Sequence, residues 1–159
     1  MEPRAKILLV GSHATLMGAI AARLEYEHHC TVVGVVSDPA QAVGVLANRP
    51  VDIALVDMDE GGADRLGGVE VLRTVLPNVR IILISTAIDD RRIEQALKAG
   101  VNGLLAKDEV PATIAKAIHE VLAGGAHFPD GIRSRIVLDP RGLRLAESTT
   151  DGEDNHEPE

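Results

Sequence analysis

Apolar and polar residues follow two patterns along this chain, and the two alternate five times. Short runs rich in β-branched residues and leucine, apolar on both faces, are typical of strands in a parallel sheet that is covered on both sides. They occupy residues 6–10, 31–36, 51–56, 80–85 and 102–106. Between them, apolar residues recur at helical spacing, as in Leu16, Ile20 and Leu24. The pattern predicts five consecutive strand–helix units.

Capping and helix-breaking residues indicate where the helices begin and end. Asp38 is a typical N-cap, and the proline that follows it suits the first position of a helix. Pro77 ends the third helical segment, and glycines end the fourth and fifth. The predicted helices cover residues 14–27, a segment from Asp38 onward, and residues 68–76, 89–100 and 111–125.

Alternating strands and helices of about 10–15 residues imply right-handed crossovers and a parallel sheet. We therefore predict an α/β fold: one doubly wound, flavodoxin-like domain of five strand–helix units, with a five-stranded parallel sheet in the order 2-1-3-4-5. In such a fold the site opens beyond the carboxyl ends of the first and third strands. The residues that this prediction brings together are Gly11, Ser12, Asp57, Ser85 and Lys107.

The chain divides into three predicted regions. Residues 4–125 form the domain, and residues 126–146 form an extension that is either a short helix over 129–138 or a hairpin around the turn-forming residues 139–142. Residues 147–159 contain six acidic residues and no Lys or Arg, so we expect a disordered acidic tail.

Charge and composition narrow the function. The net charge is −8, but without the tail 18 acidic residues against 16 basic ones leave only −2. Because no basic face is evident, we do not expect this chain to bind nucleic acid directly. No apolar run approaches the roughly 20 residues of a membrane helix. There is no signal-peptide pattern, and Cys30 is the only cysteine, so we expect a cytoplasmic protein that does not associate with a membrane.

The strongest chemical signal is an acid that follows one strand but not another. Asp57 ends the apolar run 51–57, which places a carboxylate at the carboxyl edge of the sheet. The first strand ends instead in Gly11-Ser12, without an acid. The two strand ends that should border the site therefore differ in charge.

Residues 4–130 resemble the response-regulator receiver domain of two-component signalling, and most closely the receivers that precede a LuxR/NarL-type DNA-binding domain. The resemblance rests on residues 6–10, 32–34, 50–57 and 82–87, and most specifically on the Ala-Gly-x-x-Gly-x-Leu-x-Lys segment at 99–107. The spacings also agree, with 28 positions from Asp57 to Ser85 and 22 from Ser85 to Lys107.

The resemblance implies a role for each matching residue. Asp57 would accept a phosphoryl group, Ser85 would bond a phosphoryl oxygen, and Lys107 would offset its charge. The family holds magnesium with an acidic pair that aligns here with Gly11-Ser12, so the predicted metal site is degenerate and no cofactor is expected. Whether Asp59 rebuilds a weak magnesium site stays open. Leu104 stands where the family has an aromatic switch residue.

Three hypotheses follow. In the first, the chain is an atypical receiver and not an enzyme: a protein-interaction module that is largely independent of magnesium-assisted phosphorylation. The resemblance further implies transcription regulation through a phosphorelay, a histidine kinase as one partner, and a homodimer formed through the fourth helix, fifth strand and fifth helix. In the second, a histidine kinase phosphorylates Asp57 normally. In the third, the emptied pocket senses a small ligand.

Overall fold

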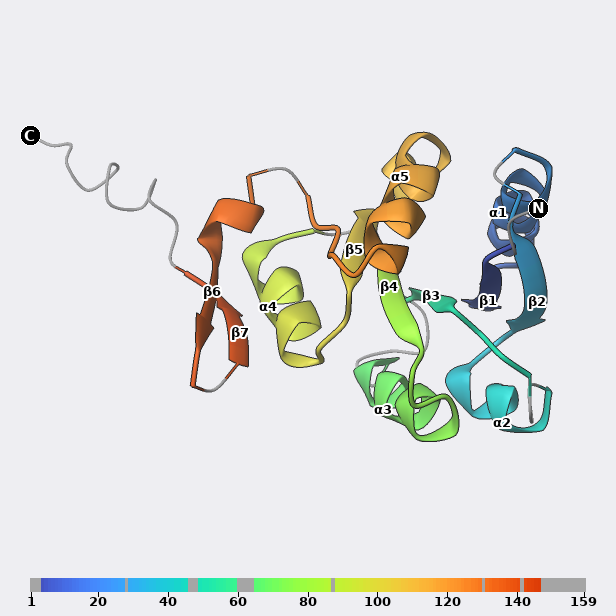
Figure 1. Ribbon diagram of the computed structural model, residues 1–159, viewed down its shortest axis with the longest axis horizontal. Helices are drawn as coiled ribbons and strands as arrows, with labels where there is room; N and C mark the ends of the chain where they lie inside the picture. The colour runs from blue at the N-terminus through green and yellow to red at the C-terminus, as the bar shows by residue number, and fades with distance from the viewer. Residues whose placement is uncertain are drawn as a thin grey trace, which may run out of the picture.

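A computed structural model describes residues 4–27, 29–45, 49–59, 65–86, 88–129, 131–140 and 142–146. Five parallel strands form one sheet in the order β2-β1-β3-β4-β5, which confirms the predicted topology (Figure 1). The strands are β1 (Lys6–Val10), β2 (Thr31–Val36), β3 (Ile53–Asp57), β4 (Arg80–Ser85) and β5 (Gly103–Ala106). The order reverses between β1 and β3, at the centre of the carboxyl edge.

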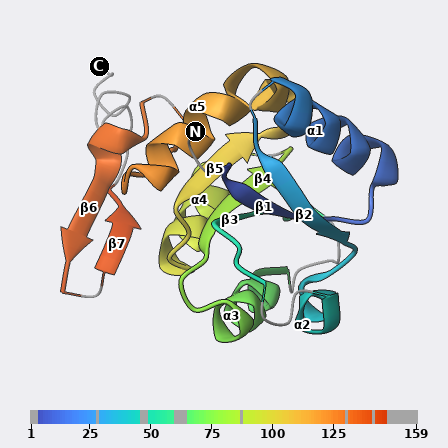
Figure 2. The same ribbon diagram turned by 45° about the vertical axis from the view of Figure 1, so that its right-hand side comes forward.

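Helices cover both faces of this sheet (Figure 2). They are α1 (Ala14–Glu27), α2 (Ala42–Val45), α3 (Arg65–Val75), α4 (Asp90–Lys98) and α5 (Val110–Leu122). Two 3-10 turns, Pro39–Gln41 and Lys107–Glu109, lead into α2 and α5. Within the described residues, no helix is both long enough and apolar enough to cross a membrane.

Alternate residues of each strand pack into separate cores. Leu8 of β1 and Val56 of β3 pack with the helices α3 and α4 on one face. Leu9 and Leu55, their neighbours along the chain, pack with α1 and α5 on the other. Successive side chains of a strand point to opposite faces. This is why the strand sequences are apolar at nearly every position rather than at every second one.

Most element boundaries follow the local signals. Asp38 accepts a hydrogen bond from the Ala40 N–H, and Asp89 accepts one from the Arg92 N–H at the start of α4. Gly100 ends the α4 segment with a φ of +74°, a conformation that glycine adopts without strain. Several boundaries differ from prediction by one to three residues; the largest shifts include the start of β3 at Ile53 rather than residue 51, the start of α3 at Arg65 rather than residue 68, and the end of α5 at Leu122 rather than residue 125.

A tertiary contact explains why α3 contains glycines. The helix contains two consecutive glycines, which disfavour a helix locally. However, a Cβ at Gly68 would lie 2.3 Å from Cγ of Pro39, in the turn before α2. Only glycine allows this close approach, so the packing of α3 against that turn outweighs the local preference.

The extension after α5 forms a hairpin. The Leu104 N–H donates to the carbonyl of His127 at 2.8 Å, and the His127 N–H donates to that of Asn102 at 3.0 Å, so this segment adds to the edge of β5. A 3-10 turn (Arg133–Arg135) then leads into the antiparallel strands β6 (Ile136–Asp139) and β7 (Gly142–Leu145). The alternative of a helix that extends to residue 138 is wrong, because Ile136–Leu138 belong to β6 and pair with β7.

The hairpin packs beside α4 (Figure 2). The guanidinium of Arg135 donates to both carboxylate oxygens of Asp90, at 3.1 and 2.8 Å, and also to the carbonyl of Ala146. One arginine thus ties both ends of the hairpin to the first turn of α4. The predicted acidic tail, residues 147–159, lies outside the described residues. The proposed boundaries at residues 125 and 146 stay predictions.

Candidate functional site

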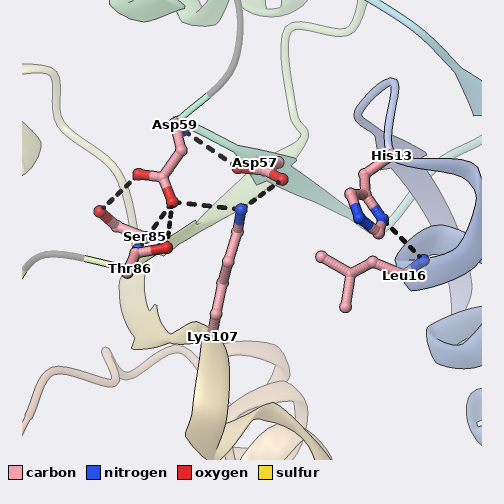
Figure 3. A network of polar contacts seen from close by, with 7 residues as sticks. All are labelled: His13, Leu16, Asp57, Asp59, Ser85, Thr86 and Lys107. Atoms are coloured by element: carbon pink, nitrogen blue, oxygen red, sulfur yellow. Dashed lines mark hydrogen bonds and ion pairs between the residues drawn. The ribbon is translucent and has the colours of Figure 1, made fainter.

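The parallel register brings the predicted acceptor, hydroxyl and lysine together at the carboxyl edge. Asp57 of β3 pairs with Ile84 of β4, and Ser85 pairs with Ala106 of β5. Lys107 directly follows β5. Side chains that are 28 and 22 positions apart in the sequence therefore converge on one point (Figure 3).

Asp57 is fully buried, and among the described residues Lys107 is the cation that compensates its charge. Its Oδ2 lies 3.0 Å from Nζ of Lys107, and its Oδ1 accepts a hydrogen bond from the Asp59 N–H at 3.0 Å. Oδ2 accepts no hydrogen bond of normal geometry from the described residues, so its contact with Lys107 is an ion pair. A buried carboxylate is stable only when it is paired in this way.

Asp59, two residues beyond the strand, forms most of the hydrogen bonds at this edge. Its Oδ1 accepts from Oγ of Ser85 at 3.1 Å, and its Oδ2 accepts from the N–H and hydroxyl of Thr86 at 2.8 and 2.6 Å. The same Oδ2 lies 3.1 Å from Nζ of Lys107. In Figure 3 the carboxylate of Asp59 lies between the lysine and the two hydroxyl side chains.

These contacts perturb two titrating groups. Partial burial opposes the ionisation of Asp59, but the hydrogen bonds from Thr86, Lys107 and Ser85 outweigh it and lower the pKa of its carboxyl to about 2. Burial would lower the pKa of Lys107, but its contacts with Asp57 and Asp59 outweigh that effect and raise it. Asp59 and Lys107 are therefore both charged at neutral pH.

The end of β1 borders this network without supplying an acid. A Cβ built on Gly11 would lie 3.1 Å from both Sδ and Cε of Met17 and 3.2 Å from Cβ of Asp57, so the space beside Asp57 is already filled. Ser12 is exposed. His13 Nδ1 accepts a hydrogen bond from the Leu16 N–H at 3.1 Å and caps α1 (Figure 3).

The membership of the polar network differs in part from what the sequence predicted. Leu104 is fully buried in the core that packs against α3 and α4, so the structure does not bring it into the polar network. Thr86, which sequence reasoning missed, contributes two donors. The available signal was a second hydroxyl residue directly after Ser85. Met17 was also missed, because the filling of space by a side chain leaves no motif.

The donor set differs from that of a magnesium site. Magnesium requires near-octahedral coordination by oxygen atoms, usually including one or two carboxylates. Here three of the four carboxylate oxygens of Asp57 and Asp59 accept hydrogen bonds, and the fourth pairs with Lys107. In the described part of the chain, no three His, Cys, Asp or Glu side chains are grouped as metal ligands would be. The residues present do not fit magnesium.

Two cavities lie away from the carboxylates. One of about 200 Å³ lies between α1 and α5, where Lys107 contributes to its wall. Another of about 810 Å³ lies at the opposite edge of the sheet, near Arg4, Cys30 and His119.

Comparison with known proteins places this geometry in context. The model of the response regulator receiver domain family matches residues 7–119. The nitrate/nitrite response regulator protein NarL of Escherichia coli K12 is 28% identical over 154 residues, which cover 97% of this chain and 69% of that protein. The matched region includes Asp57, Ser85 and Lys107.

Solved structures agree in fold. The signal receiver domain of the response regulator NarL from Mycobacterium tuberculosis superposes with a TM-score of 0.68 at 26% identity, covering 77% of this chain and 99% of that one. A LuxR-family response regulator from Aurantimonas sp. SI85-9A1 gives a TM-score of 0.73 at 23% identity, covering 83% of this chain and 94% of that one.

Proposed function

This chain belongs to the response regulator receiver domain family, and we propose that it is an atypical receiver. In this proposal it regulates by binding other proteins and works largely without magnesium-assisted phosphorylation. It is neither an enzyme nor a direct DNA-binding chain, and it acts in the cytoplasm.

The observation that carries the proposal is the end of β1. Phosphoryl transfer to a carboxylate needs positive charge against the equatorial phosphoryl oxygens, and a metal ion normally supplies much of it. Here Gly11 supplies no ligand, and Met17 and Asp57 fill the space that a side chain at this position would need.

The remaining charges do not replace the metal. Lys107 is the cation beside Asp57, and it already pairs with two carboxylates. Two carboxylates against one ammonium leave a formal charge of −1 before any phosphoryl group arrives. A dianionic group would therefore enter a position that is already negative, which disfavours the reaction.

The partners are proposed to be signalling proteins, among them a histidine kinase. Homodimerisation through α4, β5 and α5 remains the expectation from the family. However, the segment around His127 lies along β5, and the hairpin packs beside α4. A second copy that used this face would have to contact or displace the chain's own hairpin.

The test is the chemical labelling of Asp57. The full chain is incubated with acetyl phosphate and magnesium and its intact mass is recorded, with a receiver that has the acidic pair as the positive control. We expect no phosphoryl adduct. An adduct on the wild-type chain that disappears in Asp57→Asn would disprove the proposal.

The convergence of Asp57, Ser85 and Lys107 supports a second candidate function, a working phosphoreceiver modified by a histidine kinase. It predicts saturable amide NMR shifts at these residues with magnesium and beryllofluoride, whereas flat titrations would count against it. The third candidate is a small-ligand sensor that uses the pocket left by the missing acidic pair; the cavity of about 200 Å³ between α1 and α5, which Lys107 borders, lies next to that position. A ligand-dependent rise in melting temperature across a metabolite panel would support that function, and a uniform null would count against it.

A further inference from the structure

We propose that Asp59 is the resident anion of this site. Its carboxylate occupies a preformed oxyanion site, which we define as the donors of Ser85, Thr86 and Lys107, and it thereby excludes external oxyanions such as phosphate. The inference deepens the proposed function and rests on it, because it explains what replaces an external phosphoryl group.

The first argument is the convergence of donors. Four donors contact the two oxygens of one carboxylate: the hydroxyl of Ser85, the N–H and hydroxyl of Thr86, and the ammonium of Lys107. They include an ammonium, a backbone amide and two hydroxyls, a combination that suits a small oxyanion. Three of the four contacts are made to a single oxygen, Oδ2.

The second argument is the different anchoring of donors and acceptor. Ser85 is fully buried at the end of β4, and Thr86 and Lys107 follow β4 and β5 directly, so the sheet determines their positions. Asp59 lies beyond the end of β3, and its side chain is 22% exposed. Asp59 stands two residues beyond its strand, whereas Thr86 and Lys107 each stand one residue beyond theirs, so the sheet fixes the backbone of the acceptor less directly than that of its donors.

The third argument is charge. Without the Asp59 carboxylate, Lys107 would retain Asp57, but Ser85 and Thr86 would no longer donate to a carboxylate at this position. Water or a dissolved oxyanion would then replace the carboxylate, and the ammonium of Lys107 favours the oxyanion.

A purely structural role for Asp59 makes a different prediction. If the carboxylate only held the β3–α3 connection against β4, its removal would loosen that connection without creating affinity for anions. The distinguishing measurement is therefore anion binding, and stability alone does not decide between the two roles.

The experiment titrates inorganic phosphate, and in parallel sulfate, into the full chain while amide NMR shifts are recorded. Sulfate cannot transfer a phosphoryl group to Asp57, so equal responses to both ions identify a free oxyanion. We compare the wild type with Asp59→Ala and with Asp57→Asn/Asp59→Ala, in which neither carboxylate repels the ligand. Both variants should bind at least about tenfold more tightly than the wild type, with saturable shifts at the amide of Thr86.

A matched control removes one negative charge nearby without touching the site. Asp108 is exposed and follows Lys107 directly, so Asp108→Ala tests whether a general change in charge is sufficient. Equal gains in Asp108→Ala would overturn the inference. So would an absence of anion binding by both Asp59 variants when their spectra remain native-like. The labelling of wild-type Asp57 is a separate readout, so failure of the proposed function and failure of this inference are distinguishable.

Discussion

Replacing Asp59 by Asn isolates the charge of the resident anion, because the amide retains the shape of the side chain. The contacts of Asp59 lower the pKa of its carboxyl from an ordinary 3.8 to about 2. That difference corresponds to about 2.4 kcal/mol of folding free energy. Because the side chain is 22% exposed, water screens part of it, and we expect Asp59→Asn to lose about 1–2 kcal/mol at pH 7.

Asp57 makes the sign of this prediction informative. The two carboxylates share one lysine, and their mutual repulsion alone would make the loss of the Asp59 charge stabilising. However, the pKa of Asp59 is lowered, because the hydrogen bonds from Thr86, Lys107 and Ser85 outweigh the effect of burial, so the ionised carboxylate is stabilised in the folded protein. A group whose folded-state pKa is depressed stabilises the protein above its unfolded value of 3.8, and that contribution is lost as the pH falls toward 2.

Urea unfolding of the wild type and of Asp59→Asn between pH 7 and pH 3 measures this effect. The difference in unfolding free energy should be largest at pH 7 and fall to about half by pH 3, where the carboxyl is largely protonated in the unfolded wild type. The reasoning is refuted if Asp59→Asn is as stable as the wild type at pH 7. A difference that stays constant with pH would also refute it, because the effect would then not come from ionisation.

Three further predictions follow from the same structure. Lys107→Met leaves the buried carboxylate of Asp57 without its cation, so the free energy of unfolding measured with urea should fall by about 3 kcal/mol. Lys107→Arg, which keeps the positive charge, is the control, and a loss below about 1 kcal/mol in Lys107→Met would contradict the ion pair. Gly11→Ala should lower the free energy of unfolding by about 1–3 kcal/mol, because its Cβ would contact Met17. In a double-mutant cycle the same substitution should cost less when Met17 is already Ala, and equal losses in both backgrounds would show that Met17 does not fill that space. Arg135→Gln should reduce the amide-exchange protection of β6 and β7 but not of β1 and β3, since Arg135 ties the hairpin to α4; unchanged protection would mean that other contacts hold the hairpin.

Local sequence patterns were sufficient to predict the architecture. Apolar runs and caps identified five strands and five helices, and the bounds of β1, β2, β4 and α1 match the prediction. The candidate site followed from the same reasoning. In a parallel sheet all strands end at one edge, so residues that end or directly follow a strand must meet there, as Asp57, Ser85 and Lys107 do.

The contacts within the site depended on the tertiary structure. Asp59 lies in a turn beyond β3, where the side-chain direction depends on the path of the loop rather than on the alternation of a strand. Its approach to Thr86, 27 positions away, therefore has no local signal. The filling of the space beside Gly11 by Met17 is likewise a property of packing between β1 and α1.

The sequence by itself therefore determined the five strand–helix units and the residues that end each strand, because periodicity and caps act between near neighbours, and the general topology of doubly wound sheets then gave the strand order. Only the tertiary structure decided which side chain occupies that edge, that Gly68 fits against Pro39, and that the extension forms a hairpin beside α4 rather than a helix. These outcomes depend on distances between segments that are far apart in the sequence, and a local pattern carries no information about such distances.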